Sequence, residues 1–535
     1  ASDVYKRQGF FGLENSWDMQ NYVDVLTNLN KNIADDYTLA LNVGASLTDQ
    51  MNDALINQGP LRNDGLPNVF NVQNIEQGAQ KAQFYQKGWR EQTQSVFGSL
   101  EVSWRRLLFL TVTGRNDWAS QLAGSNHKSF FYPSIGLSGI LTDMLSEELR
   151  NKMYNSLSFA KLRVAYAQVA SPFQRGLTMQ LNTFSQDDKK WVKEGYYPLK
   201  DLKPERTNSF EIGLTTKWIQ NKLNFDITYY KTNTKNQTIK AAMSASSGYN
   251  YTYVQTGNVQ NQGIEIALGG TINIGKNFSW DTNFTYGYNK NEIKELVANV
   301  KNPQNPNEPL FEKDELLKDN FGNAQIILRP GGTLGDIYAK TDFVRDAYGN
   351  IDISQDLKPR NEYLKLGSLL PDATMGWRND FRYKNLSFGF MISARIGGIV
   401  VSGTQAAMDY SGVSKVTADA RDAGGVTLSP GVVVPAQSYY QLQGRPKDYL
   451  TQYYTYTASN VRLREAYISY NIPRKWLGNV LDLSLSLTGK NLLMLYCKAP
   501  FDPESVSSTG NYAQGLDYFM LPSLRSLGFS IKAKF

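Results

Sequence analysis

The chain has 535 residues, more than one ordinary hydrophobic core organises, so it forms either several domains or one very large β architecture. Its composition favours the second: 12% of the residues are aromatic, with 32 tyrosines, and 43 glycines stand against 19 prolines. The formal net charge of +7 is spread along the whole chain, so the sequence predicts no nucleic-acid surface, and no apolar run is long enough for a membrane helix.

Most of the chain consists of short stretches in which apolar and polar residues alternate, the pattern of a strand with one apolar and one polar face. In the clearest pair, Phe210, Ile212 and Leu214 alternate with Glu211 and its neighbours, and a similar stretch follows after a short turn. The predicted strands are, in chain order, residues 17–30 (the least regular), 37–47, 94–104, 108–117, 130–141, 157–168, 209–218, 223–230, 257–274, 278–293, 373–383, 386–396, 458–470, 480–490 and 524–535. A short helix is predicted over residues 142–154, which contain good helix formers and no breaker.

The connections between these strands alternate in length. From residue 94 onward, each short turn or connection is followed by a long one, up to the C-terminus. Before it, a long stretch rich in Asn and Gln runs to Gln92, and no strand is predicted in it. Transmembrane barrels have this arrangement, with short periplasmic turns and long extracellular loops, and strands of about 10 residues cross the apolar layer. The predicted fold is therefore an all-β, antiparallel up-and-down transmembrane β-barrel with about 14 or 15 strands.

The alternation also assigns the two faces of the strands. The apolar residues are expected to face lipid. The polar residues expected in the lumen are Glu211, Lys217, Asp226, Glu265, Asp281, Asn283, Arg378, Arg382, Arg395 and Asp482. The aromatic residues expected at the membrane interfaces are Trp104, Trp218, Trp280, Trp377, Tyr229 and Tyr383.

The two ends of the chain differ. Residues 1–8 (ASDVYKRQ) do not join the pattern that follows, so we expect a scar of cloning or sequence assembly, with residues 9–535 forming the barrel region and the N-terminus truncated. At the C-terminus, Leu527, Phe529, Ile531 and Phe535 alternate with polar or small residues, and the chain ends on the aromatic Phe535. Such an end is typical of the closing strand of a membrane barrel.

Several short motifs, taken in order, resemble the C-terminal barrel region of the SusC/RagA type of TonB-dependent outer-membrane transporters. Each is weak alone, but their succession is specific. They are GRNDW (114–118), FFYPSIGLSG (130–139), LKPERTNSFEIGL (202–214), NVQNQGIEI (258–266), PDATMGWRNDFRYKNLSF (371–388), ASNVRLREAYISYNIP (458–473), GKNLL (489–493) and FDPE (501–504).

The resemblance implies a 22-stranded barrel in the outer membrane of a Gram-negative bacterium, of which this chain supplies about 14 or 15 strands. It implies an N-terminal plug domain that this chain lacks, contact with the TonB complex through the missing N-terminal part, and a SusD-like surface lipoprotein as partner. Lipid and lipopolysaccharide would surround the barrel, and Phe529, Ile531 and Phe535 would form the signal for the barrel-assembly machinery.

The implied function is TonB-dependent import of a large nutrient, an oligosaccharide or a peptide. Aromatic rings stack on sugars, and carboxylates and amides bind their hydroxyl groups. The candidate substrate contacts are Asn116, Asp117 and Trp118, expected in the loop after the GRND strand, and Trp191, Tyr196 and Tyr197 in the next loop. Packing within the loops is the competing explanation for these side chains.

Alternatives remain open: a TonB-dependent siderophore or cobalamin receptor, a surface binding or adhesion protein without transport, and a membrane-barrel enzyme. The sequence disfavours the enzyme and predicts no cofactor and no metal site, because the chain has one histidine, His127, and one cysteine, Cys497. Asp502 and Glu504 in FDPE are predicted to form a turn around Pro503 rather than a cation or acid/base site.

Overall fold

The computed structural model describes most of the chain, and the statements below concern these residues. They are residues 9–66, 68–79, 81–179, 182–185, 190–193, 195–199, 201–243, 248–255, 257–298, 300–301, 307–311, 313–321, 324–507 and 515–535. Residues 1–8, the predicted scar, lie outside them.

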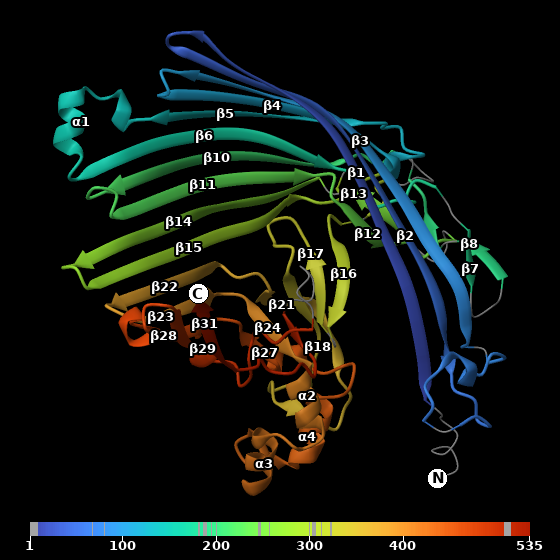
Figure 1. Ribbon diagram of the computed structural model, residues 1–535. Coiled ribbons are helices and arrows are strands. Elements are labelled where there is room, and N and C mark those ends of the chain that lie inside the picture. Colours follow the sequence, from blue (N-terminus) through green and yellow to red (C-terminus); the bar gives the residue numbers. More distant parts are fainter. Residues whose placement is uncertain are drawn as a thin grey trace. The chain divides into compact units, whose positions relative to one another are not determined.

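The dominant element is a 15-stranded sheet (Figure 1). Each of its strands is hydrogen-bonded to the strands of this sheet that come before and after it along the chain. Its order ends on β1 at one side and β31 at the other. The strands are β1 (Phe10–Ala34), β2 (Tyr37–Pro60), β3 (Gln83–Trp104), β4 (Leu108–Ala119), β5 (Phe130–Ile140), β6 (Leu157–Ser171), β10 (Glu205–Trp218), β11 (Leu223–Lys235), β14 (Asn258–Ile274), β15 (Phe278–Glu295), β22 (Ala373–Tyr383), β23 (Leu386–Ile396), β28 (Asn460–Ile472), β29 (Asp482–Cys497) and β31 (Ser526–Lys534). This confirms the predicted up-and-down order of strands.

The chain divides into two compact units, each described here by itself. The first comprises residues 1–137, 166–208 and 234–256, and its pairs from β1 to β4 are antiparallel. The second comprises residues 138–165, 209–233 and 257–535, and its pairs from β14 to β31 are also antiparallel.

The short turns agree with the sequence prediction, whereas two strands are longer than predicted. Residues 105–107 connect β3 to β4, and the Leu107 N–H donates to the Trp104 carbonyl at 2.8 Å. Arg105 and Arg106, the two central residues of this turn, adopt φ of 52° and 59°, the left-handed values of a type I′ turn.

In the Asn/Gln-rich stretch where no strand was predicted, residues 48–60 continue β2 and residues 83–92 begin β3, and only the part between them connects the two strands. Polar pairs join these strand ends, including Arg90 Nε to Asp49 Oδ1 at 2.8 Å. The strand ends were missed because their sequences lack the apolar alternation on which the prediction depended.

The predicted helix over residues 142–154 is present but shorter. A 3₁₀ turn at Thr142–Met144 precedes α1 (Glu147–Met153), whose Ser146 hydroxyl oxygen accepts the N-terminal cap bond from the Leu149 N–H. Among the described residues, no helix has both the length and the apolar character needed to cross a membrane.

The sheet has an apolar face and a polar face. Partners in antiparallel register point to the same face, so Phe388, Ile468, Leu487 and Phe529 form one apolar row across β23, β28, β29 and β31. These side chains are exposed, with Leu487 at 58%. A continuous row of exposed apolar side chains indicates a surface that contacts another protein or a membrane. The polar side chains of the strands occupy the other face.

The long connections fold into smaller structures of their own. In the first unit these are β7 (Asn182–Ser185) paired with β8 (Lys190–Lys193), and β9 (Tyr196–Tyr197) beside β13 (Tyr251–Gln255) and β12 (Thr238–Ala242). In the second unit they are β16 (Leu316–Phe321), β17 (Ala324–Leu328), β18 (Asp336–Asp342), β19 (Val344–Arg345), β20 (Ile351–Asp352), β21 (Lys358–Ser368), β24 (Ile399–Ser402), α2 (Gly403–Tyr410), α3 (Lys415–Asp422), β25 (Val426–Ser429), β26 (Val432–Val434), α4 (Ala436–Gln443), β27 (Thr455–Thr457) and β30 (Leu516–Asp517).

Three connections of the second unit pack together into what we call the loop cap: the described residues of 296–372, 397–459 and 498–525. Phe343 stacks on Tyr439 with ring centroids 5.4 Å apart, which joins the first two connections. The Ser402 hydroxyl donates to Asp517 Oδ2 at 2.5 Å, which joins the second and third. Val401 and Leu450 are completely buried, so the loop cap has a core of its own.

Candidate functional site

The polar face carries ion pairs that are held in place by neighbouring strands. Arg163 of β6 reaches Asp226 of β11 at 2.8 Å, and both contact the Thr215 hydroxyl of β10. Gly213 lies under the guanidinium, where a Cβ atom would come within 2.5 Å of it, so a side chain at this position would displace the guanidinium from its place beside Asp226. Asp226 thus belongs to a polar network, in agreement with its predicted position.

The first group of predicted substrate contacts lies in a strand rather than in a loop. Asn116, Asp117 and Trp118 are all part of β4, which continues to Ala119, so the predicted loop position is wrong. The antiparallel pairing of β4 with β3 explains this position, because it continues without a break to the pair of Ala119 with Thr93.

The three side chains point to different faces. Asn116 pairs with Val96 of β3 and Trp118 with Gln94, so both lie on the face that carries Val96, and Trp118 is 45% exposed. Asp117 is buried on the polar face, where it pairs with Arg115 Nε at 2.8 Å and accepts a hydrogen bond from the Tyr132 hydroxyl at 2.8 Å. Of the three, only Asp117 belongs to a polar cluster, and its substrate contact stays a prediction.

The second predicted group is divided between packing and exposure. Tyr196 is buried and donates to the carbonyls of Gly176 and Met179, so it holds the loop together. Tyr197 makes an edge contact with Tyr249 at 5.2 Å. Packing therefore explains the contacts that both tyrosines make.

Trp191 differs from the two tyrosines. It lies on the β7–β8 hairpin against Phe184, with centroids 5.6 Å apart, and 71% of it is exposed. Its ring is available to a ligand, and its substrate contact also stays a prediction.

The FDPE segment attaches the loop cap to the sheet through two arginines of β28. Arg462 is only 4% exposed; its guanidinium pairs with Asp502 and lies 3.3 Å from Glu504, while Arg464 contacts Glu504 at 2.6 Å. The Glu504 N–H also donates to Asp502 Oδ1 at 3.0 Å, which closes the predicted turn. Sequence reasoning predicted the turn but missed its ionic partners.

The electrostatics of this network favour the ionised carboxylate. Burial alone raises the pKa of Asp502, but the hydrogen bonds from Arg462 and from the Glu504 N–H outweigh it and lower the pKa of Asp502 to about 2. Among the described residues, no group of three or more His, Cys, Asp or Glu side chains is arranged to hold a metal ion. The acidic pair in FDPE is thus explained by its arginines.

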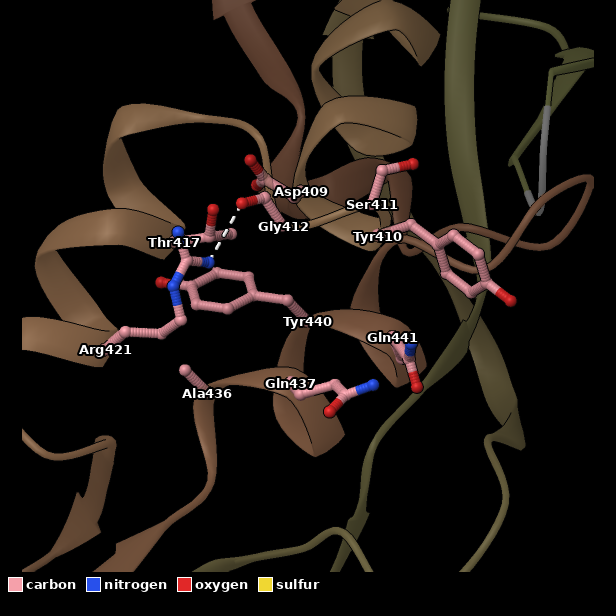
Figure 2. A pocket seen from close by; sticks show the side chains of 10 residues that line it. All are labelled: Asp409, Tyr410, Ser411, Gly412, Thr417, Arg421, Ala436, Gln437, Tyr440 and Gln441. Atoms are coloured by element: carbon pink, nitrogen blue, oxygen red, sulfur yellow. Dashed lines mark hydrogen bonds between the residues drawn. The ribbon is translucent and has the colours of Figure 1, made fainter.

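A pocket of about 250 Å³ lies in the loop cap between α2, α3 and α4 (Figure 2). The three helices fall in a stretch predicted as loop, although Ser402 and Ser414, whose hydroxyl oxygens cap α2 and α3, are a local signal of helix starts. The side chains that line it are mostly polar or aromatic: Asp409, Tyr410, Arg421, Gln437, Tyr440 and Gln441 are among them.

Hydrogen bonds fix the charged groups of the pocket. The buried Asp409 accepts from Gln405 Nε2 at 2.8 Å, one turn earlier on α2. Arg421 of α3 donates from one nitrogen to the Gly412 carbonyl at 2.9 Å, as the dashed line in Figure 2 shows. Hence the pocket has fixed charged groups, with the carboxamides of α4 at its lower side in Figure 2.

Comparison with known proteins decides the family. The family model described as "TonB dependent receptor-like, beta-barrel" matches residues 2–492, which is most of the chain. The chain belongs to this family. It is a β-barrel protein of the outer membrane of Gram-negative bacteria, which explains the exposed apolar face of the sheet because lipid covers it.

Individual members of the TonB-dependent receptor family agree. The chain is 25% identical to TonB-dependent receptor P3 of Formosa agariphila over 523 residues, covering 88% of this chain and 48% of that protein. It is 23% identical to TonB-dependent receptor SusC of Bacteroides thetaiotaomicron, covering 71% and 38%. The chain therefore spans about half the length, or less, of the curated relatives it matches.

Among solved structures, the RagAB peptide importer in its open-open state has the same fold. The TM-score is 0.75 at 17% identity, and the match covers 98% of this chain and 55% of that one. Its closed-closed state gives a TM-score of 0.74 at 18% identity. These matches confirm the barrel fold of the family, and together with the sequence match to SusC they agree with the SusC/RagA resemblance.

The predicted assembly signal lies on β31 and directly after it, at one end of the sheet order. Phe529 and Ile531 face Leu487 and Leu485 of β29, on the apolar face, and Phe535 follows the end of β31. All three are exposed. Their recognition by the barrel-assembly machinery stays a prediction.

Proposed function

We propose that this chain is the barrel region of a TonB-dependent importer that carries an oligosaccharide across the outer membrane, with a peptide as the second candidate substrate. The observation that carries the proposal is the family match over residues 2–492 together with a large folded loop cap on the side of the long connections. The match to SusC at 23% identity and the fold shared with the RagAB peptide importer support membership of the SusC/RagA group.

The mechanism needs no chemical step in the substrate. The substrate binds to aromatic and polar side chains of the outer connections and of the polar face, and energy from the TonB complex opens the path. A SusD-like lipoprotein covers the outer opening. The polar clusters around Asp226 and Asp117 provide fixed hydrogen-bonding groups along the polar face.

The test is growth and uptake in a strain that lacks the gene. We expect the deletion to abolish growth on one class of oligosaccharide, and uptake of its fluorescent derivative, while restoration of the gene returns both. Uptake should also stop when the gene for TonB is deleted. Loss of growth on peptides alone would move the substrate to the second candidate, and loss of uptake of an iron chelate or cobalamin alone would overturn the proposal.

A further inference from the structure

We propose that the pocket between α2, α3 and α4 binds one neutral sugar unit and captures the oligosaccharide at the surface of the loop cap. This inference rests on the proposed function, since it assigns a place where the substrate is first held. The pocket is distinct from the residues that the sequence singled out, because none of them lines it.

The size of the pocket sets the size of the ligand. Its volume of about 250 Å³ is below the roughly 300–1,000 Å³ of sites that enclose a drug-sized molecule. It therefore accommodates a single ring and leaves the rest of an oligomer outside. A pocket of this size suits an oligomer that inserts one of its units and leaves the others exposed.

The charges of the pocket favour a neutral ligand. Asp409 and Arg421 contribute one charge of each sign. Asp409 is 5% exposed and its carboxylate already accepts from Gln405, so little of it reaches the cavity. Arg421 uses one nitrogen for the Gly412 carbonyl, and a guanidinium has further N–H donors for a hydroxyl group.

The remaining groups match sugar hydroxyls. Gln437 and Gln441 are one turn apart on α4, so they lie on the same side of the helix, and each carboxamide both donates and accepts hydrogen bonds. Tyr410, at the end of α2, is 37% exposed and offers a ring face with a hydroxyl. Rings together with amides are the usual means by which a pocket fixes a small polar ligand.

A peptide fits the lining less well. Peptides are commonly bound by adding a strand to a sheet edge or by apolar pockets for their side chains. All three elements that form this pocket are helices, and Ala436 is the one aliphatic side chain among its lining residues. The pocket therefore offers hydrogen bonds in place of apolar anchors.

The experiment is saturation-transfer difference NMR on the protein purified in detergent from outer membranes of cells that produce it. The probes are free glucose, galactose, mannose and xylose, with alanylalanine and glycylglycine as the peptide arm. The pocket variants are Tyr410→Ala and the double change Gln437→Ala with Gln441→Ala, all at exposed positions. The control is Tyr348→Ala, which removes an exposed tyrosine from another part of the loop cap.

We expect saturation transfer to at least one sugar, a several-fold decrease in both pocket variants, and no change in the control. Equal sugar signals in all variants, or transfer to the dipeptides alone, would overturn the assignment. Oligosaccharide uptake, measured in the same strains, separates the two proposals. If wild-type cells import the oligosaccharide but saturation transfer to the sugars is the same in wild type and pocket variants, only the pocket assignment fails. If no oligosaccharide is imported, the proposed function fails.

Discussion

The sheet and the loop cap of the second unit use apolar residues in opposite ways. In the sheet, Leu487 of β29 is 58% exposed, and lipid covers it. In the loop cap, Val401 and Leu450 are completely buried, as in a soluble domain. The sheet therefore depends on the membrane to cover its apolar residues, whereas the loop cap buries its own. Arg462 and Arg464 of the sheet connect the two through their ion pairs with the FDPE segment.

The largest expected effect comes from breaking that connection. Arg462→Ala leaves Asp502 and Glu504 without their buried partner, and the loss of one partner of a buried pair costs about 3–5 kcal/mol. We expect a decrease of this size in the free energy of unfolding, measured by urea titration of the protein in lipid vesicles, and faster proteolysis of residues 498–525. The control Arg474→Ala breaks an exposed pair with Asp482 and should cost less than about 1 kcal/mol; equal effects would contradict the connection.

The two cores should respond differently to the same truncation. Leu450→Ala leaves a cavity in the loop cap and should lower the free energy of unfolding by about 2–5 kcal/mol. Leu487→Ala should cost less, because lipid chains fill the space on the apolar face. The same urea titration compares the two variants, and a larger loss for Leu487→Ala would show that protein rather than lipid covers β29.

Acid should weaken the connection before it affects the cores. The pKa of Asp502 is lowered to about 2, so its ion pair contributes stability in full above about pH 4 and loses it as pH falls toward about 2. Proteolysis of residues 498–525 by an acid-active protease should therefore accelerate across that window. In Asp502→Asn the rate should be high already and should not rise in this way; parallel profiles would argue against the pair.

The smallest effect concerns the predicted substrate contacts of β4. Asp117→Ala removes a hydrogen-bonding group from the polar face and should lower uptake about 2–10-fold, the value of one hydrogen bond. Trp118→Ala changes the apolar face and should leave uptake unchanged. The uptake assay described above compares the two variants at equal protein levels. A larger loss of uptake in Trp118→Ala would show that the substrate contacts the other face of β4.

The sequence predicted the sheet well because membrane strands carry the strongest alternation. All 15 strands of the sheet were predicted in order, and the errors fall where no apolar layer imposes alternation. The ends of β2 and β3 are joined by polar pairs such as Arg90 with Asp49, and the helices α2 to α4 belong to the loop cap.

The candidate site was less predictable than the fold. The motif FDPE could be recognised, but its partners Arg462 and Arg464 lie about 40 residues earlier, and only the fold brings them together. The pocket likewise combines three helices of eight residues each, too short for an apolar periodicity that would predict them. Long-range contacts of this kind do not leave a local pattern.

The central claim is that the sheet crosses the outer membrane with its long connections outside and its short turns in the periplasm. Labelling of introduced cysteines with a membrane-impermeant maleimide tests it most directly, after Cys497→Ser removes the single native thiol. Tyr348→Cys, in the loop cap, should react in intact cells, whereas Lys276→Cys, in the turn between β14 and β15, should react only after the outer membrane is opened. Labelling of Lys276→Cys in intact cells, with Tyr348→Cys protected, would contradict the account.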